Sequence, residues 1–310
     1  MNDKIIIAGG TGYLGRVLTG YFIKNKDRVY IITRQKTVFK NKINYINWND
    51  NWQKELESAK AIINLTGKSI NCLFNKRNKK EILSSRINAT NLLNEAINAC
   101  KIPPKIFINA SGAAIYKYCL TTIYDENNTT FGNSYLSKIC QQWETIFYET
   151  ETPNTRKVAI RITPVLGKGA TTIRVIKKIV NLGLGGKQGN GKQYFSWIHE
   201  SDFVCAIVFI IENKEIKGSV NMTAPNAVSN AQFMRSFRKI LKIPFGIPTP
   251  NFLLNISKYI TKTEPELILE SSHLIPEKLK NAGFKFIYPT IEVALSNLFT
   301  KASIRKALKK

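Results

Sequence analysis

Three glycines near the start of the chain have the spacing of a dinucleotide-binding turn. Gly9, Gly12 and Gly15 follow the short apolar run Lys4–Ala8 and precede an amphipathic stretch at 16–23. In such a unit the first glycine allows a tight turn, the second clears the path of a pyrophosphate, and the third lets the helix approach the strand. The helix N-terminus then presents its backbone amides to the phosphates. We therefore expect a dinucleotide to contact the turn and the first helical residues, which are Gly9, Thr11, Gly12, Tyr13, Leu14 and Gly15.

The end of the second strand-like run indicates which dinucleotide is bound. Arg34 stands where a site that prefers NAD usually has Asp or Glu for the ribose 2′-hydroxyl, and no carboxylate occurs between Asp27 and Asp50. An arginine there would attract a 2′-phosphate through charge-assisted hydrogen bonds. The sequence thus favours NADP(H) as the cofactor. The alternative is that Arg34 is a solvated surface residue in a lysine-rich chain.

Strand-like and helical stretches alternate along the first half of the chain. The clearest strand-like runs are Lys4–Ala8, 29–33, 61–65, 105–110 and 157–162, and the helical stretches lie near 13–25, 76–101 and 132–150. This alternation predicts the α/β class, with a Rossmann-type doubly wound parallel sheet.

The character of the chain changes after residue 162, where glycine and proline gather at 183–191 and 244–250. We expect residues 1–165 to form the NADP(H)-binding domain, with 200–223 returning to its sheet. Residues 166–310 would then supply a smaller C-terminal α+β region that binds substrate.

Composition narrows the class of protein. The chain has 310 residues, of which 44% are hydrophobic, enough to bury a large core. No apolar stretch approaches the roughly 20 residues of a membrane span, and no signal peptide is visible, so we expect a cytoplasmic protein without membrane contact. Five scattered cysteines without a CxxC pair, and only two histidines, indicate neither a disulfide framework nor a metal site.

The net charge of +25 would suit nucleic acid, but the lysines are spread along the whole chain instead of forming a stripe. The densest basic runs, 75–80 and 305–310, are most simply solvated faces. We expect a small-molecule substrate and no specific nucleic-acid partner. The oligomeric state stays open.

Several motifs resemble the extended short-chain dehydrogenase/reductases. These are GGTGYLG at 9–15, INLTG at 63–67 and SRINAT at 85–90. Four further segments are similar to the atypical "epimerase family" branch, the NAD-dependent epimerase/dehydratase-like proteins: LGLGGKQGNGKQ at 182–193, SWIHESD at 196–202, NMTAPN at 221–226 and GFKFIYP at 283–289. The resemblance covers nearly the whole chain. It implies a Rossmann domain, NADP(H) binding and a small C-terminal substrate domain.

The resemblance also implies further cofactor contacts, at Thr33, Arg34, Leu65, Thr66, Glu81, Arg86 and Val165. Leu65 and Val165 could instead be sheet core, and Glu81 could be a solvated helix residue. Arg86 follows two serines on an otherwise apolar helix and is harder to explain by solvation.

The catalytic pattern of the family fails in this chain. Most short-chain reductases place Tyr-xxx-Lys on one helical face, where the lysine lowers the tyrosine pKa for proton transfer. The register set by the Trp143-Glu144 pair places Leu136 and Cys140 at those two positions. Tyr135 and Lys138 lie close by, but their +3 spacing is one residue out of register.

Ser111 and Cys140 are the remaining catalytic candidates. Ser111 follows the strand-like run 105–110, although the register through Tyr116 places Gly112 at the usual hydroxyl position. Ser111 could equally cap a loop, and Cys140 could be an inert buried thiol. We expect His199 to hold an inter-domain hydrogen bond.

Two classes of function remain open. One is an NADP(H)-dependent oxidoreductase or epimerase that acts on a small polar carbonyl or carbinol compound, such as a sugar nucleotide. The other is a non-catalytic NADP(H)-binding regulator or scaffold. The missing Tyr-xxx-Lys pair favours the second class, and the glycine-rich segment 182–193 with the second domain favours the first.

Overall fold

The computed structural model describes residues 3–254, 264–269 and 272–300. Its centre is an eight-stranded sheet in the order β12-β8-β6-β5-β1-β2-β4-β3, in which only the edge strand β3 runs antiparallel to its neighbour. The strands are β1 (Lys4–Ala8), β2 (Arg28–Thr33), β3 (Val38–Lys40), β4 (Ile43–Asn47), β5 (Ala61–Asn64), β6 (Ile106–Gly112), β8 (Arg156–Ile162) and β12 (Gly218–Met222).

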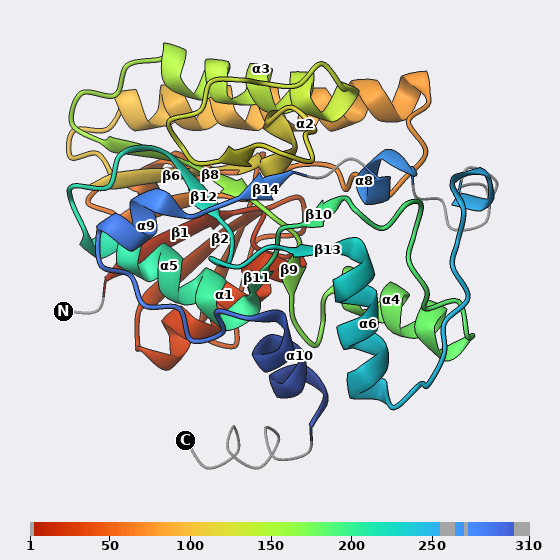
Figure 1. Cartoon of the computed structure of the whole chain (residues 1–310). Coiled ribbons are helices and arrows are strands. Elements are labelled where there is room, and N and C mark those ends of the chain that lie inside the picture. Colours follow the sequence, from red (N-terminus) through yellow and green to blue (C-terminus); the bar gives the residue numbers. More distant parts are fainter. Residues whose placement is uncertain (1–2, 255–263, 270–271, 301–310) are drawn as a thin grey trace.

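Two layers of helices cover the faces of this sheet (Figure 1). Helices α1 (Tyr13–Lys24) and α5 (Glu200–Glu212) pack on one face, and α2 (Lys76–Asn98) and α3 (Tyr135–Glu149) pack on the other. Strands β1 and β5 are therefore buried on both sides, which explains their unbroken apolar sequences. The expected doubly wound α/β architecture is confirmed.

The strand order reverses between β1 and β5. The connections that follow β1 and β5 run to opposite sides of this point in the sheet. The carboxyl ends of the two strands therefore border a crevice, and sheets of this type bind ligands in such a crevice. The β3–β4 hairpin, by contrast, was not expected from the sequence. It turns at Asn41 and Lys42, both of which have positive φ, without the glycine that usually marks such a turn.

Most of the shorter elements build a smaller region beside the carboxyl edge of the sheet. They are β7 (Ile123–Tyr124), β9 (Val165–Leu166), α4 (Thr171–Asn181), β10 (Tyr194–Phe195), β11 (Ile198–His199), β13 (Val228–Ser229), α6 (Asn230–Leu241), α8 (Glu266–Leu269), β14 (His273–Leu274) and α10 (Ile291–Phe299). Helix α9 (Glu277–Asn281) packs against β12 instead, and two short 3-10 turns occupy Gln53–Leu56 and Ala113–Ile115.

A separate apolar cluster holds part of this region together. Trp197, Phe233 and Phe237 are fully buried in it, beside residues of α4 and α10. The division into 1–165 and 166–310 stays a proposal, and residues 255–263, 270–271 and 301–310 of the second part lie outside the described residues.

The described residues contain neither a membrane-spanning helix nor a group of metal-binding side chains. No helix among them is long and apolar enough to cross a membrane. Within the same residues, no three His, Cys, Asp or Glu side chains are grouped to hold a metal ion.

His199 caps the N-terminus of α5 and joins the two regions. Its Nδ1 accepts a hydrogen bond from the amide of Ser201 at 3.1 Å, and its ring packs on Tyr288 with centroids 3.8 Å apart. The side chain is 1% exposed, and burial lowers its pKa from 6.5 to about 4.

This burial predicts a pH-dependent stability. The unfolded chain binds a proton at His199 below its ordinary pKa of 6.5, whereas the folded chain does so only below about 4. The free energy of unfolding therefore decreases as the pH is lowered from 6.5 to about 4. The contribution lost is about 3 kcal/mol at 1.36 kcal/mol per pKa unit. His199→Asn keeps an N-cap acceptor and should flatten this part of the profile, measured as urea unfolding free energy against pH. Identical slopes in the two proteins would contradict the assignment.

Candidate functional site

The glycine turn after β1 lies in the crevice between β1 and β5. Gly9 has φ +75°, and its amide donates to the carbonyl of Ile32 on β2 at 3.0 Å. A Cβ at Gly9 would lie 2.9 Å from backbone atoms of Leu65 and Thr66, directly after β5. The turn and the end of β5 are thus in backbone contact, which excludes a side chain at position 9.

Gly15 and Gly12 differ in whether the surrounding protein leaves room for a side chain. A Cβ at Gly15 would lie 2.4 Å from the backbone of Gly10, so packing of α1 on the turn excludes any side chain there. A Cβ at Gly12 would meet only the carbonyl of Gly9, at 3.6 Å, and φ is an ordinary −71°. Nothing in the protein itself requires glycine at position 12.

Gly12 is the N-cap of α1, and no side chain caps this helix end. The first turn contains no acidic residue, and the amides of Tyr13 and Leu14 lie too early in the helix to have an intrahelical acceptor. Open space above Gly12 beside uncapped amides fits a phosphate or pyrophosphate group. The residues present thus fit a dinucleotide.

Arg34 follows the end of β2 beside the glycine turn. Its side chain is exposed, and its carbonyl accepts from Asn47 at 3.2 Å, which fixes the backbone here. Within the described part of the chain, no carboxylate lies at ion-pair distance from Arg34. The preceding Thr33 is buried, and its hydroxyl accepts from the amide of Gln35 at 3.2 Å.

A buried polar chain fixes the opposite wall of the crevice. Thr66 donates through its amide and hydroxyl to the side-chain oxygen of Asn64, at 3.0 and 2.5 Å. Asn64 donates in turn to Asn109 on β6 at 2.7 Å and to Thr90 on α2 at 3.2 Å. Leu65, whose amide bonds to Ala8, therefore sits in a rigid segment.

Arg86 lies farther along this wall. Its guanidinium lies over the ring of Trp143 at 5.0 Å, and Nη1 donates to the carbonyls of Lys68 and Ile82 at 3.1 and 2.8 Å. A Cβ at Gly67 would lie 3.0 Å from its Cζ. Burial lowers the pKa of Arg86, yet no carboxylate of the described residues pairs with it. A half-buried cation of this kind suits an oxygen of a bound anion or carbonyl.

Glu81 supports the same wall indirectly. Its carboxylate pairs with Lys68 at 2.5 Å and with Arg77 at 2.8 Å, and the bond from Lys68 lowers its pKa to about 2. The predicted cofactor contact at Glu81 is therefore made by a side chain already engaged with two cations.

Cys140, which the sequence register places at the position of the lysine, lies in the interior of the protein. The thiol is buried, and burial raises its pKa to about 12, so it is protonated at neutral pH. A Cβ at Gly112 would lie 2.8 Å from its sulfur. Cys140 and Gly112 are thus complementary in volume, and Leu136 one turn earlier is buried as well.

The Ser111 hydroxyl lies in a buried ionic network. It donates to Glu144 at 2.7 Å, and Glu144 also accepts from Arg161 at 2.9 and 2.8 Å. Arg161 donates to the phenol of Tyr116 at 2.7 Å, which hydrogen-bonds to Asn221 at 2.9 Å. Burial alone would lower the pKa of Arg161, and its bonds to Glu144 raise it instead.

This network joins β6, α3, β8 and β12 beneath the site, and it gives Ser111 a structural partner. In the sequence, Glu144 served only to align α3 with the family pattern, and Arg161 was not predicted as its partner. An arginine directly after the buried apolar run 158–160 of β8 was the available signal.

The other predicted residues are placed as follows. Tyr13 donates from its phenol to Glu200 on α5, and burial raises its pKa. Val165 is 8% exposed and lies in the sheet core, on β9. Tyr135 donates to the carbonyl of Lys79 at 2.9 Å and packs on Phe74 with ring centroids 5.1 Å apart, while Lys138 is exposed.

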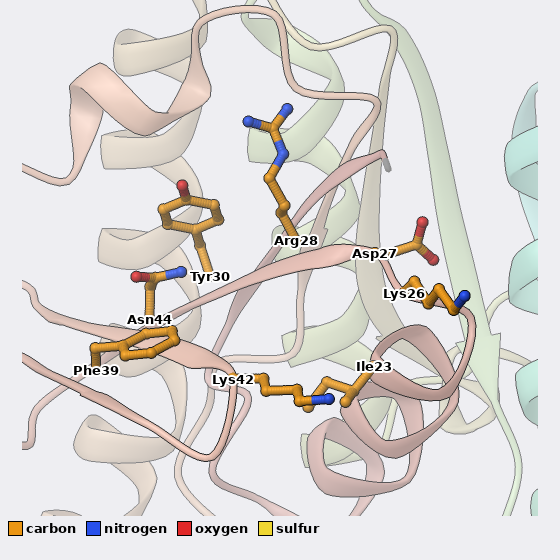
Figure 2. Close-up of a pocket in the computed structure, with 8 residues that line it drawn as sticks. All are labelled: Ile23, Lys26, Asp27, Arg28, Tyr30, Phe39, Lys42 and Asn44. Atoms are coloured by element: carbon orange, nitrogen blue, oxygen red, sulfur yellow. The ribbon is translucent and has the colours of Figure 1, made fainter. Parts of the chain in front are cut away.

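A hollow of about 420 Å³ opens at the opposite end of the sheet (Figure 2). It lies between the end of α1, the start of β2 and the β3–β4 hairpin, and Arg28, Tyr30 and Phe39 are among its lining residues. None of the residues predicted for cofactor binding or catalysis lines it.

Comparison with known families decides the assignment. Residues 5–222 match the model of the NAD dependent epimerase/dehydratase family, which is more than half of the chain. The chain belongs to this family. Residues 249–298 of this epimerase-family protein match a second model, a domain of unknown function (DUF1731).

Relatives of similar length carry the same family name, which confirms the resemblance drawn from the motifs. The protein is 35% identical over 301 residues to epimerase family protein YfhF of Bacillus subtilis, covering 95% of this chain and 97% of that one. It is 33% identical over 295 residues to epimerase family protein SSP1921 of Staphylococcus saprophyticus, covering 94% and 98%.

Solved structures agree with the fold. The human epimerase family protein SDR39U1 (isoform 2), crystallised with NADPH, superposes with a TM-score of 0.86 at 29% identity and covers 95% of this chain and 98% of that one. A nucleoside-diphosphate sugar epimerase from Corynebacterium glutamicum has a TM-score of 0.78 at 23% identity, covering 100% of this chain and 62% of that one, which supports the fold alone.

Gly12→Val tests the phosphate site. The new side chain has room in the protein but would occupy the approach of the pyrophosphate, so the variant should fold normally and lose dinucleotide binding in calorimetric titration. Gly20→Val on the same helix is the matched control, because a Cβ there meets nothing within 4 Å. Normal NADPH binding by Gly12→Val would show that the turn is not the phosphate site.

Proposed function

We propose that this epimerase-family protein binds NADP(H) and uses it to oxidise, reduce or epimerise a small polar carbonyl or carbinol compound. The observation that carries the proposal is the open position at Gly12, beside an uncapped helix end, in a turn that Gly9 bonds to the end of β2 shortly before Arg34. The NADPH in the crystal structure of the human relative supports the choice of dinucleotide.

The chain's own residues divide the work of binding. The amides that begin α1 would hold the pyrophosphate, and Arg34 with Thr33 would meet the adenosine 2′-phosphate. Leu65 and Thr66 would border the dinucleotide across the crevice, with Val165 and Glu81 as further positions implied by the family. The bound cofactor would supply or accept the hydride.

Arg86 is the residue we assign to the reacting end. It is a cation without a carboxylate partner among the described residues, on the wall that continues from Thr66 through Gly67. A guanidinium there would bind the oxygen of a carbonyl or alkoxide and stabilise its negative charge. Leu136 and Cys140 would then shape the pocket, since neither carries a mobile proton at neutral pH.

Ser111 and Cys140 remain weaker catalytic proposals. The hydroxyl of Ser111 is held by Glu144, and the thiol of Cys140 is buried against Gly112. Such fixed groups favour the second candidate function, a regulator that binds NADP(H) without turnover.

The substrate class rests on similarity of fold. The Corynebacterium glutamicum protein of the same fold is named as a nucleoside-diphosphate sugar epimerase, so sugar nucleotides are the first compounds to test. Mass spectrometry of ligands that copurify with the protein, followed by a metabolite screen monitored by NADPH absorbance, tests the proposal. Tight NADPH binding without turnover of any carbonyl or carbinol compound would favour the regulator.

Arg34→Ala should remove the preference for NADPH. A charge-assisted contact with the 2′-phosphate contributes about 1.5–3 kcal/mol, roughly a tenfold to hundredfold difference in affinity. Calorimetric titration of NADPH and NADH into both proteins measures it. Equal affinities for the two cofactors in the unsubstituted protein would refute the assignment of Arg34.

Arg86→Ala should lower turnover far more than Tyr135→Phe. The phenol of Tyr135 is already bonded to the carbonyl of Lys79, whereas loss of a positioned charge-stabilising group costs about 10²–10³ in kcat. Ser111→Ala should also lower turnover, through the Glu144 network. Arg86→Lys, which keeps the charge, should restore part of the rate. A collapse of turnover in Tyr135→Phe alone would restore a tyrosine-centred mechanism.

A further inference from the structure

Helix α4 and the segments that follow α4 and α6 expose large apolar side chains, which we name the apolar tip. Leu182 and Phe245 are 65% and 64% exposed, and three more side chains on the same segments are exposed by at least 42%. The members of the apolar tip are Val175, Leu182, Leu184, Phe245 and Ile247. Single exposed apolar residues need no explanation, but a group of this size marks an interaction surface.

Backbone hydrogen bonds hold the apolar tip in shape. The amide of Gly186 donates to the carbonyl of Ile247 at 3.1 Å, and the amide of Ile247 donates to Gly183 at 2.8 Å. Gly183, with φ +77°, ends α4 and lets the amide of Leu184 reach the carbonyl of Ile179. A Cβ at Gly183 would lie 3.6 Å from the ring of Phe245, so the two segments are adjacent.

The surroundings of the apolar tip are entirely basic in sequence. No Asp or Glu occurs between Glu151 and Glu200, or between Glu215 and Glu264, and these two stretches supply α4, α6 and the whole tip. Exposed cations lie on both helices and on the segments that follow them: Lys177, Lys178, Lys187, Lys239 and Lys242. The carboxylate of Glu292 reaches α6 from α10, where it accepts from Ser236.

Exposed apolar side chains flanked by lysines suit one kind of partner. Phosphates of a nucleic acid would pair with the lysines but would leave leucine and isoleucine side chains in water. A bilayer surface with anionic headgroups satisfies both, because lysines meet the headgroups while apolar side chains enter the boundary with the acyl chains. Because α4, α6 and the apolar tip carry no carboxylate of their own, they add no repulsion toward such a surface.

We propose that the apolar tip docks the protein on anionic lipid surfaces as a peripheral contact. This departs from the expectation of no membrane contact, which was based on the length of apolar stretches and so concerned membrane spans. The crevice is built from β1, β2 and β5, so docking leaves cofactor binding unchanged and the two proposals can fail separately.

Vesicle co-sedimentation of the full chain tests the proposal. Phosphatidylcholine vesicles with and without phosphatidylglycerol are compared for the unsubstituted protein, for Leu182→Ser/Phe245→Ser, and for Val38→Ser/Phe39→Ser. The last is the matched control, because it removes two exposed apolar residues beside exposed lysines on the distant β3–β4 hairpin. Far-UV circular dichroism of each variant monitors folding independently of cofactor binding.

We expect binding only to vesicles with phosphatidylglycerol, and an at least about tenfold lower partition coefficient for Leu182→Ser/Phe245→Ser. The hairpin variant should bind like the unsubstituted protein, and part of the binding should persist in high salt. Equal binding by all three proteins, or loss of all binding in salt, would show nonspecific adsorption of a highly basic chain and overturn the proposal. Binding to DNA, and not to vesicles, in a manner that requires Phe245 would overturn it as well.

Discussion

The site depends on the direct backbone contact between the end of β1 and the end of β5. Gly9 touches Leu65 and Thr66, and Gly15 touches Gly10, at distances that exclude any side chain. These two contacts bring α1 onto the sheet with its N-terminus directed along the crevice. Gly12 lies between them and is free of such contacts, so its missing side chain leaves space for a ligand.

A second constraint is the buried pairing of Glu144 with Arg161. Two charges taken out of water are stable only when their remaining donors and acceptors are satisfied, and Ser111, Tyr116 and Ser219 complete the set here. The same arrangement holds the proton of the Ser111 hydroxyl in a hydrogen bond to Glu144, so it is not free for transfer to a substrate. Together with the Cys140 thiol packed on Gly112, it is the reason why we propose Arg86 as the group that meets a substrate oxygen.

Local signals made the sheet and the glycine turn predictable from the sequence. Apolar runs such as β1 and β5 admit few alternatives, and the glycine spacing has a stereochemical cause. The β3–β4 hairpin was missed because Asn41 and Lys42 adopt positive φ without a glycine. The Glu144–Arg161 pair was missed because packing of α3 on β8, and no sequence spacing, brings the two side chains together. The complementary volumes of Gly112 and Cys140 are likewise visible only in three dimensions.

The position of the pyrophosphate tests the account most directly. A crystal structure of the protein with NADPH should place the pyrophosphate within hydrogen-bond distance of the amides of Tyr13 and Leu14, above Gly12, with the 2′-phosphate at Arg34. Phosphates bound elsewhere, for example among the lysines of the β3–β4 hairpin, would contradict the account.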